Sequence, residues 1–520
     1  MLRTLRHLGR TIRIARALAQ ADALFLADAH PLAKNAAKVL TWLWPPRRDL
    51  QKLRPGQRLA IALGGLGPTF IKFGQALSTR TDLLGEEAAA DLAELQDRLP
   101  PFPFAAAKTQ IETDFGGPFT NLFREIDPKP VAAASIAQVH FGVDTGGREV
   151  AIKVLRPDIA AIFAAEIDFL DWGAGLALKF APKLERLKPK EVVATFAETV
   201  RVEMDLRFEA AAAQELAENF KGDPGFRVPA VDWQRTSEHV LTLERVSGLR
   251  VDNRQAVEGA GLDPRAVVKG AAEAFFNMVF RDGFFHADMH PGNLFVTTNQ
   301  NRPGGQIIAM DFGIMGRVDA ATRKTLGEML LGFLTRDYKK VAEVHVSAGF
   351  VPSHKSVDAF AQACRSIAEP ILGKPIAEIS VAKLLGQLFA ITETFEMQVQ
   401  PQLLLLQKSM LVAEGVGRNL APEVNMWELA QPMIENWMRT RLGPEGLVSD
   451  AAESAVDTLA KIPKIIDRID RTTGEVERHG FKLHPDTAAA IRGKNGGSAW
   501  PGWLPWALVG AALIALIASA

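Results

Sequence analysis

The spacing of apolar residues predicts a chain built mainly of helices, with strands in its middle part. Residues 23–125 show helical periodicity interrupted by Pro and Gly. Between residues 130 and 156 the pattern changes and favours two strands, joined by a tight turn at Gly146-Gly147. The run HVLTLERV at 239–246 favours a third strand. The sequence therefore predicts an α+β fold.

Further along the chain the apolar positions favour helices again. An Ala- and Glu-rich segment predicts one long helix over residues 190–220. From about residue 264 helices dominate, interrupted by the segments HADMHPGNLFV and QIIAMDFG. Residues 441–498 are polar and contain Gly and Pro, and we expect a helical connector there.

Residues 1–21 predict a basic amphipathic helix. Five arginines recur every three or four residues, and the first acidic residue is Asp22, so one face of the helix is basic. The residues on the opposite face are Leu5, Leu8, Ile12 and Ala15. Three interpretations are open: contact with an anionic membrane, docking on the protein's own core, or a cleaved mitochondrial presequence.

Residues 495–520 carry no charge. From Trp503 they read WLPWALVGAALIALIASA, which nearly reaches the roughly 20 apolar residues that span a bilayer as a helix. Tryptophans at the leading edge resemble an interfacial belt. Because Arg492 and Lys494 precede the segment, we predict a membrane anchor at 499–520 with the catalytic body on the cytoplasmic side. A buried helix and a re-entrant hairpin are the alternatives.

The overall composition changes this picture little. Lys plus Arg and Asp plus Glu both total 60, and this neutrality argues against a nucleic-acid-binding protein. Hydrophobic residues make up 48% of the chain, which is typical of globular proteins. The single cysteine, Cys364, excludes an intrachain disulfide and a multi-cysteine zinc site.

Candidate chemistry begins with a lysine in a strand and a carboxylate in a helix. Lys153 lies in VAIKV, where an apolar strand would present its ammonium to an interior cleft. Glu209 lies in the predicted helix, which can supply the carboxylate that such a lysine needs, and Asp205 is expected on the same face. Taken alone, a lysine at a sheet edge and a solvated acidic helix face are the more common explanations of these residues.

Two further segments have the spacing of a phosphoryl-transfer site. HADMHPGN places Asp288 five residues before Asn293, and IAMDFG follows with Asp311. One aspartate is needed to orient or deprotonate an acceptor, and an Asn and a second Asp are needed to hold Mg²⁺ with the phosphates of ATP. We expect Gly313 to permit the turn that aims Asp311 inward.

Three features qualify that interpretation. His286, Asp288 and His290 alternate, so they could instead bind a transition metal. Where protein kinases have a glycine-rich loop, this chain has Ala132–Ser135, which predicts a stiffer loop. The segment at 66–84, LGPTFIKFGQALSTRTDLL, has no counterpart in an ordinary kinase.

With these motifs the chain resembles the UbiB, or ADCK, family of atypical kinase-like proteins, from about Leu59 to Ala430. The motifs that carry the resemblance are Lys72-Phe73-Gly74-Gln75, Ala132–Ser135, Glu203-Met204-Asp205, HADMHPGN and Asp311-Phe312-Gly313. The resemblance implies a bilobal protein-kinase-like fold whose helical N-terminal extension folds over the nucleotide cleft. The expected divisions are an extension at 1–125, lobes at 126–246 and 247–440, the connector at 441–498 and the anchor at 499–520.

The resemblance also implies roles for individual residues. Lys153 pairs with Glu209, Asp288 is the catalytic-loop aspartate, and Asn293 and Asp311 bind Mg²⁺. Other expected nucleotide contacts are Ala132, Ala133, Ala134, Ser135 and Val139, with Glu244 and Val246 as hinge contacts to adenine. The expected regulatory residues are Lys72, Gln75, Glu203 and Asp205. Lys72 and Gln75 face Glu203 and Asp205 and occupy the space where a protein substrate would dock.

By resemblance, the expected function is support of ubiquinone biosynthesis at the inner (cytoplasmic) membrane. The expected activity is that of a Mg²⁺-dependent ATPase acting on lipid quinone intermediates, with anionic membrane and other quinone-pathway enzymes as partners. A true lipid, small-molecule or protein kinase and a nucleotide-binding scaffold are the alternatives. Relatives are often named 2-polyprenylphenol 6-hydroxylase, but the sequence has no flavin, haem or nicotinamide fingerprint that supports hydroxylase chemistry.

Overall fold

The computed structural model divides the chain into residues 1–438 and 439–520. The residues that it describes all lie in the first unit: 2–24, 31–78, 86–93, 95, 99–180, 185, 188–299, 302–371, 391–392, 394–397, 401–424, 429 and 431–437. The predicted connector and membrane anchor therefore lie outside the described residues. Within those ranges, no helix combines the length and apolar character needed to cross a bilayer.

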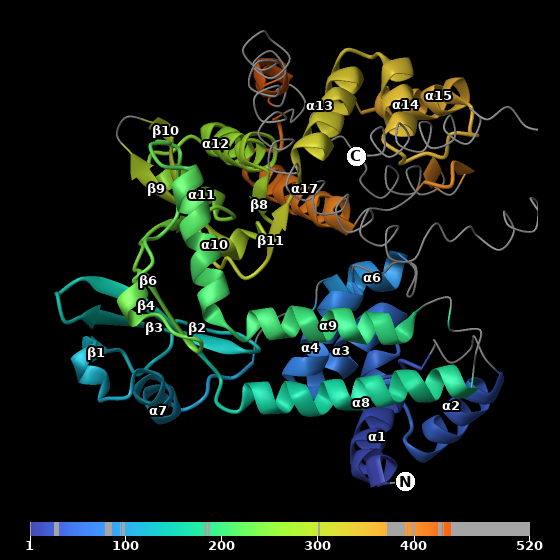
Figure 1. Ribbon diagram of the computed structural model, residues 1–520, viewed down its shortest axis with the longest axis vertical. Coiled ribbons are helices and arrows are strands. Elements are labelled where there is room, and N and C mark those ends of the chain that lie inside the picture. Colours follow the sequence, from blue (N-terminus) through green and yellow to red (C-terminus); the bar gives the residue numbers. More distant parts are fainter. Residues whose placement is uncertain are drawn as a thin grey trace, which may run out of the picture. The chain divides into compact units, whose positions relative to one another are not determined.

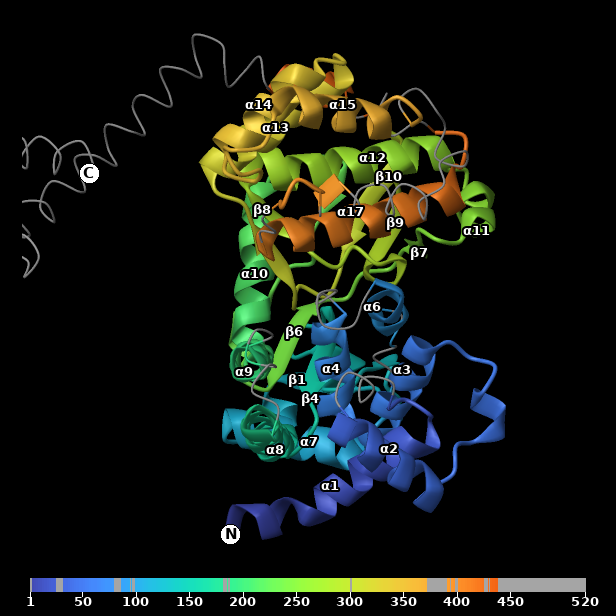
Figure 2. The same cartoon turned by 90° about the vertical axis from the view of Figure 1, so that its right-hand side faces the viewer.

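The chain begins with a group of helices that pack on one another (Figures 1 and 2). They are α1 (Leu2–Gln20), α2 (Pro31–Leu43), α3 (Pro55–Leu66), α4 (Pro68–Leu77) and α6 (Glu86–Ala93). α3 contacts α1, α4 and α6, and Leu63, Phe70 and Leu92 are buried among them. Gly74 in α4 allows close packing, because a Cβ there would lie 2.9 Å from Leu63 Cδ1 and would push that side chain aside.

The first sheet lies between helices on both faces. Its strands are β1 (Phe123–Ile126), β2 (Ala132–Ala133), β3 (Ala137–Asp144), β4 (Glu149–Leu155) and β6 (Val240–Glu244), in the antiparallel order β1-β3-β4-β6 with β2 beside β3. Side chains alternate between the two faces. Ile152 and Val154 pack toward α7 (Phe104–Phe115), and Leu155 and Leu241 pack toward α8 (Ile159–Phe180) and its neighbours.

The predicted long helix at 190–220 is wrong, because the chain forms two helices there. α9 (Pro189–Glu203) ends just before Asp205, and α10 (Leu206–Asn219) begins just after it. Asp205 has extended backbone, and its carboxylate accepts a hydrogen bond from Arg207 N, which caps α10. Asp205 therefore does not share a helical face with Glu209. A strong local N-cap outweighs the continuous helical pattern on either side.

The second lobe combines a sheet with many helices. Strands β5 (Phe226–Arg227), β10 (Arg302–Ala309), β9 (Leu294–Asn299) and β7 (Leu249–Arg250) form one sheet in that order, and β8 (Phe284–His286) pairs with β11 (Met315–Arg317). The helices are α11 (Arg254–Gly259), α12 (Pro264–Phe276), α13 (Ala320–Leu334), α14 (Tyr338–Ser347), α15 (Val357–Ala368) and α17 (Pro401–Leu420). Phe285, Phe312 and Ile307 lie in the core of this lobe.

Helix α1 docks on the protein itself, as one of the three sequence interpretations proposed. His7 is fully buried beside Trp172 of α8, with ring centroids 5.2 Å apart, and its Nε2 lies 3.2 Å from Asp168. Arg13 pairs with Glu166 of α8 at 2.8 Å. The apolar face predicted from the sequence is turned outward instead, since the side chains of Leu8 and Ile12 are exposed.

We predict that Cys364 does not react with thiol reagents in the folded protein. It lies in α15 beside Val341 and Phe360, and burial raises the pKa of its thiol to about 12, so almost no thiolate exists at pH 8. Titration with Ellman's reagent should give close to one thiol per chain in urea and close to none in native buffer. Rapid stoichiometric reaction in native buffer would contradict this packing.

Candidate functional site

Lys153 lies in the middle of β4 and joins the two lobes. Val139 of β3 and Leu241 of β6 flank it in the sheet. Its Nζ donates to both carboxylate oxygens of Glu209, at 2.8 and 2.9 Å, and to Oδ1 of Asp311 at 3.0 Å. One ammonium therefore connects β4, α10 and the segment that follows β10. The structure thus brings together three residues that the sequence singled out separately.

The shared ammonium shifts the pKa of each group that it touches. Burial opposes the charge of Lys153, but the attraction of Asp311 and Glu209 outweighs it and raises the lysine pKa well above its ordinary value. The charge of Lys153 lowers the pKa of Asp311 far below the usual aspartate range. Burial, with the negative charge of Asp311, raises the pKa of Glu209 despite Lys153. Asp311 is therefore the firmly ionised carboxylate of the pair.

The β9–β10 hairpin places Asn293 beside Asp311. In its register Ala309 lies opposite Leu294, and Met310 N donates to Asn293 O at 2.8 Å. Asp311 itself adopts a left-handed backbone conformation, with φ 61°. The sequence predicts this turn at Gly313, but Asp311 makes it instead. An aspartate can adopt the left-handed region because its short side chain can hydrogen-bond to the nearby backbone.

Asp288 is held by a network of backbone and side-chain hydrogen bonds. Its N–H donates to His286 Nδ1 at 3.1 Å, and Asn293 Nδ2 donates to the Asp288 carbonyl at 3.0 Å and to Oδ2 at 3.3 Å. Since His286 Nδ1 accepts, its Nε2 carries the proton and donates to Met310 O at 3.0 Å. The loop is therefore tied to the residue that precedes Asp311.

The alternative transition-metal site at His286, Asp288 and His290 is not formed. Both ring nitrogens of His286 are engaged by the backbone, and His290 Nδ1 accepts from Gly292 N. Among the residues that the structure describes, no group of three or more His, Cys, Asp and Glu side chains could hold a metal ion. The alternation in sequence thus serves to shape the loop.

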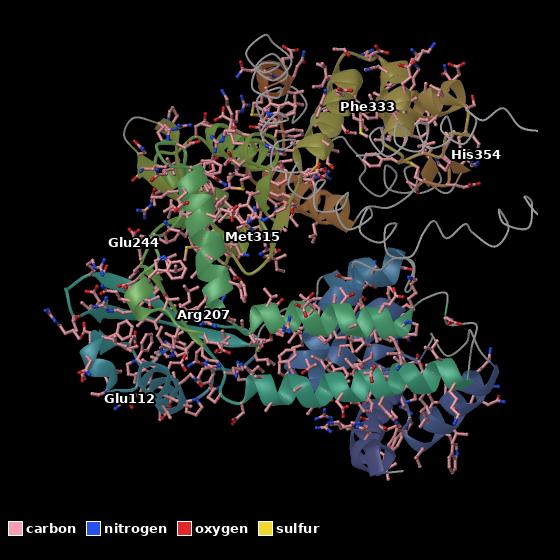
Figure 3. All side chains as sticks on the ribbon, in the orientation of Figure 1. Glu112, Arg207, Glu244, Met315, Phe333 and His354 are labelled. Carbon is pink, nitrogen blue, oxygen red and sulfur yellow. The ribbon has the colours of Figure 1, made fainter. Side chains whose placement is uncertain are left out.

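The N-terminal helices reach this site through α4. Lys72 Nζ lies 3.1 Å from Glu203 Oε2 at the end of α9, and both side chains are largely buried. The positive charge of Lys72 also contributes to the low pKa of Asp311. Gln75 donates to Leu95 O at 3.3 Å. The structure thus joins Lys72 to Glu203, while Asp205 caps α10 and pairs with Arg207, whose position is labelled in Figure 3.

The alanine-rich segment starts as a strand and continues into a tethered loop. Ala132 and Ala133 form β2, opposite Val139 and Gln138 of β3. The carbonyl of Ala134 accepts hydrogen bonds from the Arg156 guanidinium at 3.2 and 2.9 Å. Ser135, the last residue of the segment, is fully buried.

Sequence reasoning missed Arg156. Its guanidinium donates to Pro100 O at 2.8 Å as well as to Ala134 O, so it ties the loop to the N-terminal extension. Gln138 adds a second tie, because it exchanges hydrogen bonds with the backbone of Phe102 at 3.0 and 3.2 Å. The signal available in the sequence is weak: a charged residue directly after a buried strand, beside the predicted phosphate loop.

The two expected hinge residues lie where the chain leaves the first sheet. Glu244 is the last residue of β6, and Val246 lies between it and β7 of the second sheet. Glu244, labelled in Figure 3, accepts hydrogen bonds from Arg227 Nη1 at 3.1 and 3.3 Å. The Glu244 N–H donates to Ala230 O at 2.8 Å, so its side chain and its amide are both engaged within the protein.

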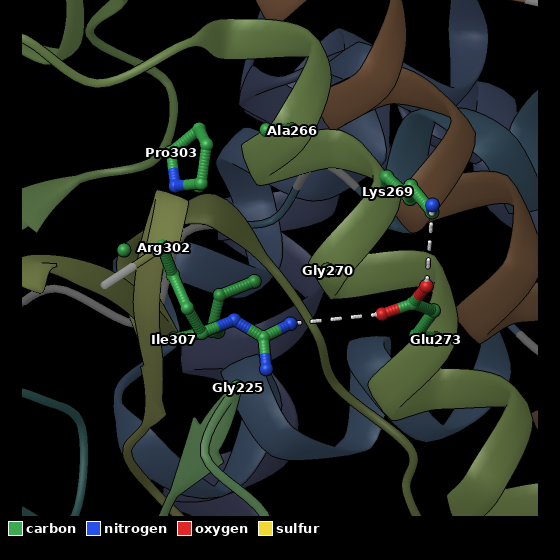
Figure 4. A pocket seen from close by; sticks show the side chains of 10 residues that line it. Gly225, Ala266, Lys269, Gly270, Glu273, Arg302, Pro303 and Ile307 are labelled. Atoms are coloured by element: carbon green, nitrogen blue, oxygen red, sulfur yellow. Dashed lines mark ion pairs between the residues drawn. The ribbon is translucent and has the colours of Figure 1, made fainter.

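A separate pocket lies in the second lobe between α12 and β10 (Figure 4). Lys269 and Arg302 line it on either side of Glu273, each at 3.8 Å from its carboxylate. None of the site residues predicted from the sequence lines this pocket. The candidate chemistry is therefore concentrated around Lys153.

The donor groups around Lys153 fit a magnesium nucleotide. Asp311 offers a firmly ionised carboxylate, and the neighbouring Asn293 uses its amide nitrogen on Asp288, which leaves its carbonyl oxygen as a ligand. Mg²⁺ prefers a few such oxygens together with phosphate and water. Lys153 supplies the cation that phosphate groups require. Asn293 and Asp311 are the residues that would hold the metal.

We predict that replacing Lys153 with Met destabilises the protein more at pH 8 than at pH 5. The change leaves Glu209 and Asp311 without their cation, and removing one partner of a buried ion pair costs about 3–5 kcal/mol. A buried Glu209 without its lysine has a pKa above its unfolded value. Its protonation relieves the penalty as pH falls, so stability is lost as pH rises.

Thermal unfolding midpoints of the wild-type protein and the variant at the two pH values measure this difference. Lys188→Met is the matched control, because Lys188 pairs with Glu191 on the surface and both side chains are mostly exposed. The control should unfold like the wild type at both pH values. An equal loss for Lys153→Met at pH 5 and pH 8 would show that Glu209 does not carry the buried charge.

Comparison with known proteins agrees with the motifs. A family model described as the ABC1 atypical kinase-like domain matches residues 94–345, and one described as the UbiB helical domain matches residues 364–425. A Marinobacter nauticus protein named "Probable protein kinase UbiB" is 44% identical over 414 residues, which cover 80% of this chain and 76% of the relative. One of the same name from Aeromonas salmonicida is 42% identical over 456 residues, which cover 87% and 83%.

A solved structure, that of a Mycobacterium tuberculosis protein in complex with erythromycin, is 23% identical and has a TM-score of 0.48; the match covers 81% of this chain and 98% of that one. The kinase-like domain match and the two lobes confirm the expected bilobal, kinase-like α+β fold. With 44% identity over 80% of its length to a relative of that name, the chain belongs to the UbiB family of atypical kinase-like proteins.

Proposed function

We propose that this protein is a Mg²⁺-dependent ATPase that acts at the membrane and supports ubiquinone biosynthesis by acting on lipid quinone precursors. The observation that carries the proposal is the contact of Lys153 with both Glu209 and Asp311, beside Asn293. Family membership supports the kinase-like part of the proposal. The ubiquinone pathway is inferred from the resemblance and from the name UbiB that the relatives carry.

In this proposal each side chain has a separate task. Lys153 binds phosphate oxygens, and Glu209 holds its ammonium in place from α10. Asn293 and Asp311 hold Mg²⁺, which when bound neutralises charge that develops on the transferred phosphoryl group. The loop around Ala134 lies over the phosphates, fixed by Arg156. Asp288 orients the hydroxyl of water or of another acceptor.

A protein acceptor is disfavoured in this proposal, because the N-terminal helices lie at the site. Lys72 contacts Glu203 at the end of α9, just before α10, and its positive charge contributes to the low pKa of Asp311. The ring of Phe73 packs on Phe196 of α9, with centroids 5.2 Å apart, so α4 is anchored between the site and the rest of the extension. A folded protein substrate would have to displace this helix. A small molecule or the headgroup of a lipid would not.

A true kinase is the second candidate, and one observation favours it. Asp288 is oriented by His286 and Asn293 in the manner that transfer to an acceptor hydroxyl requires. Incubation with radiolabelled ATP distinguishes the two functions. Label on a lipid, phenolic or protein acceptor that disappears in Asp288→Asn would favour the kinase, and phosphate released only to water would favour the ATPase.

We also propose that the protein is located at the inner (cytoplasmic) membrane, with the catalytic body on the cytoplasmic side. The support is the uncharged segment 503–520 with Arg492 and Lys494 before it, all outside the described residues. Lipid quinone precursors are apolar, so an enzyme that acts on them requires access to the bilayer. The quinone-pathway enzymes would meet it there.

We predict that Asp311→Asn lowers ATP hydrolysis about 100-fold, because one metal-binding carboxylate contributes several kcal/mol to the transition state. Phosphate release is measured with the purified full-length protein in vesicles that contain anionic lipid, with and without a phenolic headgroup mimic and Mg²⁺. Asp358→Asn is the matched control, since Asp358 lies exposed in the first turn of α15.

The control should hydrolyse ATP at the wild-type rate. Unchanged hydrolysis by Asp311→Asn would rule out the proposed Mg²⁺ chemistry. Quinone content of a deletion strain, complemented with wild-type protein or with Asp311→Asn, tests the pathway separately. Full restoration by a variant that does not hydrolyse ATP would indicate a nucleotide-binding scaffold instead.

A further inference from the structure

Two helices near the start of the chain expose large apolar side chains. On α1, Leu8 and Ile12 are one helical turn apart, and their side chains are 54% and 47% exposed. On α2, Val39, Trp42 and Leu43 are 61%, 82% and 54% exposed and follow the same spacing. We call these five residues the α1–α2 surface. An indole exposed to this extent is unusual on a protein surface and indicates a site where another molecule binds.

The two stripes belong to one structural unit. α1 and α2 contact each other, and they lie next to each other in both ribbon views (Figures 1 and 2). α1 is fixed from its other side, because His7 is buried and Arg13 pairs with Glu166 of α8. The outward direction of Leu8 and Ile12 is therefore set by packing on α8. Both apolar stripes remain accessible on the outside of the folded lobe.

The segment that carries this surface has a basic excess in its sequence, part of which is paired, since Arg10 and Arg13 contact Glu166. Residues 1–54 contain eleven Lys and Arg and three Asp, whereas the whole chain carries equal numbers of basic and acidic residues. On α2, Lys34 and Lys38 are exposed at positions that flank Val39 and Trp42. Exposed Trp and aliphatic side chains bordered by basic ones match the interface of an anionic bilayer, where apolar groups enter between lipids and cations contact headgroups.

We propose that the α1–α2 surface docks on an anionic lipid bilayer and inserts Trp42 and its apolar neighbours at the level of the headgroups. This inference rests on the membrane location proposed above and names a second, peripheral contact with the bilayer. α1 packs on α3, and α3 packs on α4, which carries Lys72. Docking would therefore place the bilayer next to the N-terminal extension, whose helix α4 reaches the nucleotide site.

The single cysteine of the chain allows a direct test. In full-length protein with Cys364→Ser, Trp42→Cys is labelled with an environment-sensitive NBD fluorophore and incorporated into vesicles. Vesicles of phosphatidylcholine with phosphatidylglycerol should shift the emission at position 42 to the blue, and vesicles of phosphatidylcholine alone should not. Ile12→Cys is a second label for the same surface. Trp233→Cys is the matched control, because Trp233 is 48% exposed but lies next to β6.

The basic residues supply a second readout. Neutralising Lys34 and Lys38 to Gln should weaken docking about 25-fold, because one lysine at an anionic surface contributes about a factor of five. The salt concentration that abolishes the blue shift should fall accordingly. A shift of equal size at position 233 would contradict the proposal.

Two other results would overturn it and leave the proposed function standing. If positions 12 and 42 stay in an aqueous environment while the protein remains with the vesicles, another segment makes the membrane contact. If the shift appears without vesicles and grows with protein concentration, a second copy of the chain covers the surface. ATP hydrolysis is not a readout here, so failure of the proposed ATPase leaves this test intact.

Discussion

The structure of the site depends on one buried ammonium that is shared by two carboxylates. Lys153 lies in the first sheet, Glu209 in α10 and Asp311 after a strand of the second sheet. Their contacts therefore link the two lobes at the site. A charge inside a protein is stable only when it is paired and hydrogen-bonded. The same requirement makes the site ready for a phosphate, which offers Lys153 another negative partner.

The N-terminal extension is part of this arrangement because three separate contacts attach it to the first lobe. Lys72 reaches Glu203, Arg156 bonds to Pro100 and Ala134, and Gln138 exchanges hydrogen bonds with Phe102. The polar contacts surround the alanine-rich loop and the end of α9. Through α4, which packs on α3, the extension forms part of the surroundings of the site.

Charge is distributed unevenly along a chain whose total is zero. Residues 1–54 carry a basic excess, while the carboxylates of Glu209 and Asp311 lie at Lys153. Part of the basic excess serves internal packing, since Arg13 pairs with Glu166. The remainder lies beside exposed apolar side chains. The proposed contact with lipid rests on this combination of basic and exposed apolar side chains.

By itself, the sequence determined the motifs and some of the strands. Asp288 and Asn293 lie five residues apart on one loop, so their proximity follows from local geometry, and apolar runs identified β3, β4 and β6. Only the tertiary structure decided the rest. A local N-cap at Asp205 broke a helix that periodicity had continued, and Asp311 took the left-handed turn expected at Gly313. Packing of α1 on α8 turned the apolar face of α1 outward. Arg156 became a tether because the carbonyls of Pro100 and Ala134, which are distant from it in sequence, lie beside it in the fold. Periodicity records which residues can be buried, but the partner that buries them comes from elsewhere in the chain.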